Sequence, residues 1–247
     1  MKASPEAQLR LLDLAALDTE LGRLDHRRRS LPEIAELAQL TAQAGETSDA
    51  LVTAETELAD LDTEQTRAER DVEQVRARID RDQHRLDAGQ VSSAKELESL
   101  QGEIQSLLRR QGDLEEVVLD LMERRESFET SRDALTKTKD ELASSAAEVT
   151  ARRDATLGEI DQQAGKASAS RALVATAEPT ELLALYDKLR AQHGGLGAAA
   201  LRHGRCQGCN LSLNSQDLAS IRAAAPDEVL RCEECRRILV RTPESGV

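Results

Sequence analysis

Apolar side chains recur about every 3.5 residues through roughly the first 160 residues of the chain, which is the period of a coiled coil. Near the N-terminus the set is Leu14, Leu17, Leu21, Leu24 and Leu31. A helix with this period buries one stripe of side chains against another helix. The sequence therefore predicts a mainly α protein built on long coiled-coil helices.

At Pro32 the phase of this pattern slips by one residue, which predicts a kink near residue 32. Beyond it the seam continues at Leu51, Ala54, Leu58, Leu61, Gln65, Ala68, Val72, Val75, Ile79, Asp82 and Leu86. The period is then interrupted near residues 87–95, where Gly89 indicates a turn and Ser93 suits the N-cap of a new helix. A second seam follows at Leu97, Leu100, Ile104, Leu107, Gln111, Leu114, Val118 and Leu121.

These two seams predict an antiparallel hairpin in which Leu86 faces Leu97 and Ile79 faces Ile104. Arms of about 80 residues give a rod of roughly 120 Å at 1.5 Å per residue. The alternative is a parallel homodimer of one uninterrupted rod, with the interruption read as a stutter.

Farther along the second arm, half of the seam is cationic, at Arg125, Arg132 and Lys139. We expect these side chains to bury their stems and reach acids of the facing arm such as Glu46, Asp49 or Glu55. The alternative is a loosened segment that accepts a partner helix. Residues 161–178 are small and polar, which predicts fraying or a bend, and a short helix is expected from Pro179 to Gly194.

The cysteines form two C-x2-C pairs, Cys206 with Cys209 and Cys232 with Cys235, separated by 22 residues. Zn²⁺ prefers four soft ligands in a tetrahedron, and each pair supplies two thiolates from one tight loop, eased in the first by Gly208. A redox C-x2-C is disfavoured because no βαβ pattern surrounds the pairs. The sequence therefore predicts one structural Zn²⁺ per chain, held by all four cysteines.

Segments around the cysteines fit a zinc ribbon, with short strands at 196–201, 211–213, 229–231 and 238–241 and a helix capped by Asn214 or Ser215. The predicted domains are a coiled-coil hairpin over residues 1–176, a connecting helix over 177–195 and a zinc ribbon over 196–247.

No catalytic or cofactor-binding residues are predicted, and we expect no enzyme. Aromatic residues make up 1% of the chain, with Phe128 and Tyr186 the only two, so a large globular core is disfavoured. The four histidines stand isolated in the sequence, and no phosphate-binding or dinucleotide glycine motif is present.

The formal net charge of −13 disfavours broad attraction to nucleic acid or anionic lipid. Residues 201–241, however, carry seven arginines against five acids. The candidate contacts to a partner or to nucleic acid are Arg202, Arg205, Arg231, Arg236, Arg237 and Arg241. Because residues 187–247 contain no aromatic side chain for base stacking, RNA or DNA binding is expected to be weak.

The N-terminal segment carries acids from Glu6 onward and cannot form the apolar core of a signal peptide. No run of about 18 apolar residues is present to cross a bilayer. These features, together with the cysteine pairs, predict a cytoplasmic protein that binds no membrane and is a monomer or a weak dimer.

The segments Cys206-Gln-Gly-Cys209 and Cys232-Glu-Glu-Cys235-Arg-Arg-Ile-Leu, together with Lys95-Glu-Leu-Glu after the turn, resemble those of bacterial coiled-coil proteins with a C-terminal C4-type zinc ribbon. The resemblance covers nearly the whole chain and implies a non-enzymatic partner-binding protein. Some relatives are linked to the sigma-54 transcription factor, to flagellar or secretion machinery and to RNA binding. Only the zinc ligands carry over residue by residue.

Two functions follow as expectations. The first is an interaction or adaptor protein, with the coiled coil as an elongated scaffold and the ribbon as a protein-docking module linked to transcription or secretion machinery. The alternative is a nucleic-acid-binding regulatory protein that acts through the basic ribbon. Asp82 and Asp87 near the turn suggest a further comparison, with transcription factors that insert an acidic coiled-coil tip into the polymerase channel. The arms are too long for that role, and solvation explains the acids more simply.

Overall fold

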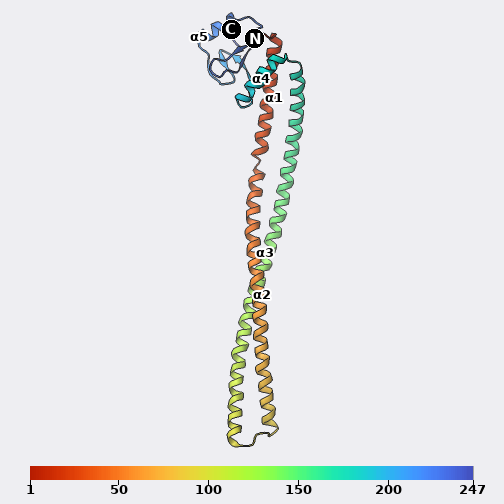
Figure 1. The fold of residues 1–247 in the computed structure, drawn as a ribbon, viewed down its shortest axis with the longest axis vertical. Helices are drawn as coiled ribbons and strands as arrows, with labels where there is room; N and C mark the ends of the chain where they lie inside the picture. Colours follow the sequence, from red (N-terminus) through yellow and green to blue (C-terminus); the bar gives the residue numbers. More distant parts are fainter. Residues whose placement is uncertain (247) are drawn as a thin grey trace. The chain divides into compact units, whose positions relative to one another are not determined.

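The computed structural model describes residues 1–246, and most of them are helical (Figure 1). The helices are α1 (Pro5–Arg29), α2 (Pro32–Asp87), α3 (Ala94–Thr176), α4 (Thr180–Gln192) and α5 (Ser215–Ala223). The strands are β1 (Ala198–Arg202), β2 (Arg205–Cys206), β3 (Leu230–Arg231) and β4 (Ile238–Arg241). The chain packs as two compact units, one formed by Met1–Ala35 with Thr150–Val247 and the other by Glu36–Val149.

The unit formed by Glu36–Val149, called the hairpin unit below, contains α2 and the first part of α3, which run side by side in opposite directions (Figure 1). The predicted seam is where side chains are buried, as at Leu61, Ala68 and Leu121, which pack in one cluster. The turn between the helices has Gly89 at φ 63°. Ser93 Oγ accepts from the Glu96 amide at 3.2 Å, and Glu96 accepts in return from the Ser92 amide at 3.1 Å, which caps α3 as the sequence predicts.

Ion pairs across the hairpin lie close to the predicted register. Arg78 of α2 pairs with Glu103 of α3, and Arg85 lies 3.9 Å from Glu96. In the alignment that places Ile79 opposite Ile104, each of these glutamates lies two residues from the position opposite its arginine. The predicted helical hairpin is confirmed, in place of the parallel-rod alternative.

The cationic part of the α3 seam agrees with the expectation only in part. The ion pairs of Arg125 with Glu129 at 3.2 Å and of Arg132 with Asp133 at 2.6 Å both lie within α3. The hydrogen bond to Asp133 raises the pKa of Arg132, and the charge of Glu55 on α2, one of the expected facing acids, acts in the same direction. Acids on the same helix, one residue or one turn away, are reached without bridging to α2.

The predicted fraying at residues 161–178 is wrong, because α3 continues to Thr176. Ile160 packs with Leu24 and Leu31 in a buried cluster, and Ala167 is also buried. Arg171 adds a hydrogen bond from α3 to Asp18 of α1 at 2.7 Å. Of the small residues in this stretch, Ala164 packs against that cluster and Ala167 is buried, whereas Ser168, Ala169 and Ser170 are exposed.

The strands form one sheet in the order β2-β1-β4-β3, with β1 parallel to β4 and the outer pairs antiparallel. Successive side chains on a strand point to opposite faces. Ala198, Ile238 and Val240 therefore join a core with Leu11 of α1 and Tyr186 of α4. The other face buries Ala199, Leu201, Cys206, Leu213, Ile221, Cys232 and Leu239 together. The central strands are thus covered on both faces.

The first residues of the chain extend this packing. The Ala3 amide donates to the Asp227 carbonyl at 2.8 Å, and the Val229 amide donates to the Met1 carbonyl at 3.1 Å. The Lys2 ammonium lies 3.0 Å from Asp227. Through these bonds the N-terminus is held beside the loop that leads into β3. Among the described residues, none of the helices has the length and apolar character needed to cross a membrane.

Candidate metal centre

The four cysteines converge although they come from two separate loops. Cys206 ends β2, Cys209 follows in the next turn, and Cys232 and Cys235 lie in the loop between β3 and β4. Their Sγ atoms all lie within 4.8 Å of one another. The Sγ atoms of Cys206 and Cys235 are 3.9 Å apart, as are those of Cys209 and Cys232. A tetrahedron with Zn–S bonds of about 2.3 Å requires about 3.8 Å between sulfurs, so the site fits Zn²⁺.

The two cysteine loops share one backbone conformation. The Asn210 amide donates to the Cys206 carbonyl at 2.8 Å, and the Arg236 amide donates to the Cys232 carbonyl at 2.8 Å. Asn210 (φ 59°) and Arg236 (φ 62°) both adopt the left-handed conformation directly after the second cysteine. That conformation is costly for a residue with a side chain, least so for Asn. Each loop thus presents two sulfurs in the same way.

Gly208 has a different role from the one expected. It does not have a positive φ, so it does not ease the turn. A Cβ at this position would instead lie 2.9 Å from Ala199 Cβ and 3.0 Å from Arg237 Cδ. The glycine is required because the loop packs directly against β1 and Arg237. Its amide also donates to Cys206 Sγ at 3.4 Å.

Burial raises the pKa of two of the thiols, that of Cys206 to about 12 and also that of Cys232. Burial acts in the same direction on Cys235, but hydrogen bonds from the backbone and side chain of Arg237, together with those from Cys232 and Cys209, outweigh it and lower the pKa to about 7. Buried thiols with raised pKa values need a cation to hold them as thiolates. A dication such as Zn²⁺ supplies that charge.

Two of the six arginines proposed from the sequence as partner contacts each donate to several backbone carbonyls. Arg237 donates to the carbonyls of His193 at 3.1 Å, Leu196 at 3.0 Å and Gly208 at 3.3 Å, which joins the first cysteine loop to the segment before β1. Arg241 donates to the carbonyls that follow α5, including Ala224 at 2.9 Å and Ala225 at 2.6 Å. Both guanidinium groups therefore hold the ribbon together.

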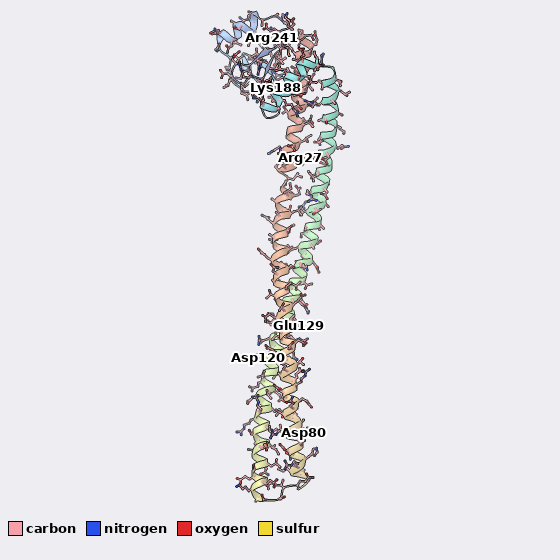
Figure 2. The ribbon with its side chains drawn as sticks, viewed as in Figure 1. Arg27, Asp80, Asp120, Glu129, Lys188 and Arg241 are labelled. Carbon is pink, nitrogen blue, oxygen red and sulfur yellow. The ribbon has the colours of Figure 1, made fainter. Side chains whose placement is uncertain are left out.

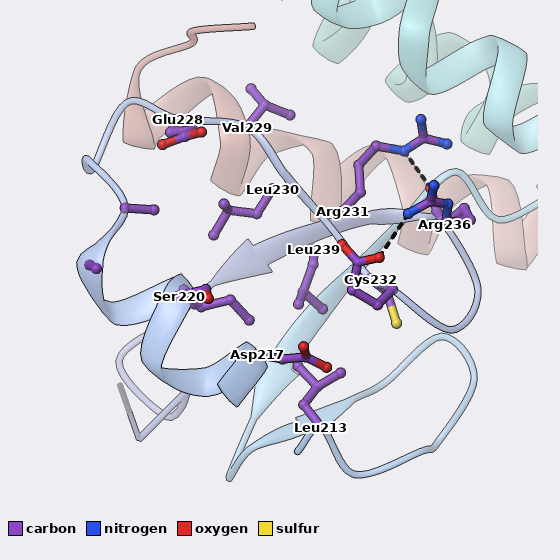
Figure 3. Close-up of a pocket in the computed structure, with 14 residues that line it drawn as sticks. Leu213, Asp217, Ser220, Glu228, Val229, Leu230, Arg231, Cys232, Arg236 and Leu239 are labelled. Carbon is purple, nitrogen blue, oxygen red and sulfur yellow. Dashed lines mark hydrogen bonds and ion pairs between the residues drawn. The ribbon is translucent and has the colours of Figure 1, made fainter. Parts of the chain in front are cut away.

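The other four arginines, Arg202, Arg205, Arg231 and Arg236, are exposed. Arg202 lies 3.2 Å from Glu244, and Arg236 lies 2.9 Å from Glu233. Arg231 donates to the carbonyl of Arg236 at 2.8 Å. Figure 3 shows Arg231 and Arg236 together at the edge of a groove.

This groove, called the ribbon groove below, lies between α5 and β3 beside Cys232, with a volume of about 680 Å³ (Figure 3). Its floor includes Ile221, Leu230 and Leu239, and its rim includes Asp217 and Ser220 from α5. Asp217 and Ser220 were not among the residues predicted from the sequence to contact a partner. Their spacing with Ala224 places them on one side of a helix, which was the available signal.

Asp82 and Asp87 do not form an acidic tip at the turn of the hairpin. Asp82 is buried on the seam, 9% exposed, with Arg78 and Arg85 each 3.9 Å from it. Asp87 accepts a hydrogen bond from Gln83 at 3.1 Å. Asp82 is therefore part of the packing between the helices and is not presented at the turn.

A long helical hairpin and a four-cysteine ribbon define a scaffold-type protein with a C4 metal centre. Residues 14–194 match the CT398-like coiled coil hairpin domain, and residues 205–239 match the C4-type zinc ribbon domain. The chain belongs to the CT398-like coiled-coil hairpin family, which confirms the resemblance seen in the sequence. Its four clustered cysteines are consistent with one structural Zn²⁺.

Relatives span the full length of the chain. An uncharacterized protein of Mycobacterium tuberculosis strain H37Rv is 40% identical over 242 residues, which is 98% of both chains. A solved structure from Mycobacterium smegmatis is 39% identical with a TM-score of 0.86 and covers 98% of this chain and 100% of its own. The structure of CT398 from Chlamydia trachomatis, 20% identical with a TM-score of 0.72 over 96% and 98% of the two chains, shares the fold.

Proposed function

We propose that this protein is a non-enzymatic, cytoplasmic zinc-binding adaptor, with the hairpin as an elongated scaffold and the ribbon as a protein-docking module. In this proposal residues 1–176, 177–195 and 196–247 are the hairpin, the connecting helix and the ribbon domain. Cys206, Cys209, Cys232 and Cys235 ligate one Zn²⁺, and a fourfold thiolate set has no open position for hydrolytic chemistry. Metal analysis of freshly purified, reduced protein is expected to give one zinc per chain, and well under half an equivalent contradicts the ligand assignment.

The ribbon groove is the observation that carries the docking proposal. It combines an apolar floor at Leu230 and Leu239 with a rim of both charges, acidic at Asp217 and Glu233 and basic at Arg236. Protein-binding surfaces have this anatomy of an apolar centre and a polar border. Because the groove adjoins Cys232, zinc binding and groove shape are coupled. A short segment of a protein partner with an apolar anchor is the occupant that these residues suit.

The docking proposal is tested by filling the groove. Ser220 lines the groove from α5, whereas the neighbouring Ala219 is exposed on the same helix and does not line it. Ser220→Trp is expected to remove the proteins that copurify with the wild type after nuclease treatment, and Ala219→Trp is expected to retain them. Equal loss in both variants, or equal retention in both, contradicts docking in the groove.

Nucleic-acid binding by the ribbon is the second candidate, and the exposed side chains of Arg202, Arg205, Arg231 and Arg236 are the observation that favours it. Two of these arginines already pair with acids. Tyr186, the one tyrosine of the chain, is fully buried and offers no ring for base stacking. Phosphate contacts alone give weak, salt-dependent binding, of roughly micromolar affinity or worse at physiological salt. Sequence-selective nanomolar RNA binding under those conditions would support this candidate over protein docking.

A further inference from the structure

Exposed apolar side chains lie along one side of α3 in the hairpin unit. Leu108, Leu119 and Met122 are 51%, 59% and 49% exposed, and each directly follows a residue of the α3 seam. Leu108 and Leu119 are separated by 11 residues, which make about three helical turns, and Met122 follows Leu119 by three residues. These three side chains therefore share one face over about 21 Å. We call them the α3 stripe.

The facing helix carries acids at the matching positions. The residues that directly follow the seam of α2 include the exposed acids Asp62, Glu69, Glu73, Asp80 and Asp87. Figure 2 shows Asp80 on α2 near the lower end of the view. In an antiparallel pair, the residue after each seam position falls on the same face of both helices. The α3 stripe is therefore bordered by acids of α2.

A groove of about 490 Å³ confirms that both sets share a face. Val72 and Val118 of the seams line it together with Glu69, Glu73 and Leu119. Arg76 adds a positive charge there, which Glu115 of α3 pairs at 2.6 Å. Hydrogen bonds from Gln111 and Arg76 lower the pKa of Glu115. The groove thus combines apolar residues with fixed negative charge.

The opposite face of the hairpin is different in charge. There a groove of about 570 Å³ is lined by Arg78, Arg81 and Arg110 as well as Asp71. Val117 directly precedes the seam residue Val118, so it lies on this opposite side, with 48% of its surface exposed. The hairpin therefore presents two unlike faces, and Val117 offers a matched control for the α3 stripe.

We infer that the face formed by the α3 stripe and the α2 acids docks an amphipathic helix of a partner protein, in which Lys or Arg flanks an apolar stripe. Such a helix buries leucines against Leu108, Leu119 and Met122 and places its cations beside Glu69 and Glu73. A second copy of this chain would bring the same acids into contact, and nucleic acid or an anionic membrane would be repelled. The inference is independent of docking in the ribbon groove.

A model peptide provides the test. The probe is a labelled amphipathic helix of leucine and lysine, titrated with the full-length, zinc-loaded protein at physiological salt. Leu108→Ser combined with Leu119→Ser is expected to weaken binding by at least about tenfold, because each buried leucine contributes strongly to an interface. Val117→Ser, on the opposite face, is expected to leave the affinity unchanged. Equal effects of the two variants, or no effect of either, would overturn the inference.

Charge reversal tests whether the acids of α2 attract the cations of the partner helix. The double variant Glu69→Lys with Glu73→Lys is expected to bind the lysine peptide more weakly than the wild type does. It is expected to bind more tightly a matched peptide in which glutamate replaces lysine. Unchanged preference for the lysine peptide contradicts the role of these acids. Sedimentation of the protein alone provides the last check, since a wild-type dimer that dissociates on Leu119→Ser would assign the face to self-association and overturn the proposal.

Discussion

At the scale of single residues, Asp18 holds together three helices. Its carboxylate has no exposed surface and accepts hydrogen bonds from Tyr186 and Arg171, each at 2.7 Å, and Arg190 lies 2.9 Å away. Burial and the bond to Asp18 raise the pKa of Tyr186 above its usual range. Because Tyr186 also belongs to the core beneath β1 and β4, Asp18 connects α1, α3 and α4 below the sheet.

We predict that Asp18→Asn destabilises this unit by about 3–5 kcal/mol, because two arginines lose their shared counter-charge in a buried site. Asp187→Asn provides the control, since Asp187 is 47% exposed and pairs with the same Arg171. It is expected to cost no more than about 1 kcal/mol. The chain has one tyrosine and no tryptophan, so urea unfolding followed by Tyr186 fluorescence reports on this unit directly. Equal midpoints for the two variants would show that Asp18 contributes little.

A second residue-scale prediction concerns the close packing of the first cysteine loop. Gly208→Ala places a methyl group against Ala199 and Arg237, and we expect a cost of about 1–3 kcal/mol together with weaker zinc binding. Gly165→Ala provides the control, since a Cβ there meets nothing within 4 Å. Competition with a chelator measures the zinc affinity of each variant. If Gly208→Ala retains zinc as well as Gly165→Ala does, the packing argument fails.

What the sequence could predict at this scale depended on distance along the chain. The cysteines were evident because each pair lies within one local loop, and two pairs at this spacing indicate a known chemistry. Asp18 was not evident, because its partners Arg171 and Tyr186 lie 153 and 168 residues away. Arg237 was assigned to a partner because nothing in the sequence shows three carbonyls converging on its guanidinium.

At the scale of elements, the apolar period predicted the seams and the turn correctly, but the end of α3 that it predicted was wrong. Residues 161–176 contain only two large apolar side chains, Leu173 and Val174, which are adjacent and set no helical period, so periodicity alone predicted fraying or a bend. In the structure Ile160 packs with Leu24 and Leu31, Ala167 is buried, and Arg171 donates to Asp18 from the same stretch. Small residues permit such close approach between helices. How much these small residues stabilise α3 depends on α1, which is distant in the sequence.

We predict that hydrogen exchange of the wild-type protein distinguishes a packed helix from a frayed one at residues 161–176. Backbone amides of residues 161–176 are expected to be protected in the wild type, because they lie in a helix packed against α1. Amides of residues 88–93, in the turn of the hairpin, are expected to exchange much faster. If residues 161–176 exchange as fast as the turn, this end of α3 is frayed, as the sequence predicted.

At the scale of the whole molecule, the ribbon is part of a larger core. One face of β1 and β4 is shared with α1 and α4, and a Cβ at Gly197 would lie 2.5 Å from the Tyr186 carbonyl. The metal centre lies on the other face of the same strands. Loss of zinc therefore affects the packing around Tyr186 as well as the cysteine loops. The seam of the hairpin unit has its own buried residues, and we expect it to stay folded without the metal.

We predict that Cys209→Ser, or chelation of the wild type, releases zinc and exposes Tyr186 to solvent while most helical signal remains. Tyrosine fluorescence quenching and far-ultraviolet circular dichroism measure the two effects in one sample. Restoring Zn²⁺ is expected to reverse the change in the wild type and not in Cys209→Ser. Loss of helical signal in parallel with zinc would indicate that the hairpin unit also depends on the metal.

Site-specific photo-crosslinking at Ser220 tests the docking claim most directly. A photoreactive amino acid replaces Ser220 in the ribbon groove or, as the control, Ala219 beside it, in cells that produce the full-length protein. The adaptor account predicts a discrete adduct with one protein at position 220, resistant to nuclease and absent at position 219. An adduct that nuclease removes, or identical adducts at both positions, would contradict it.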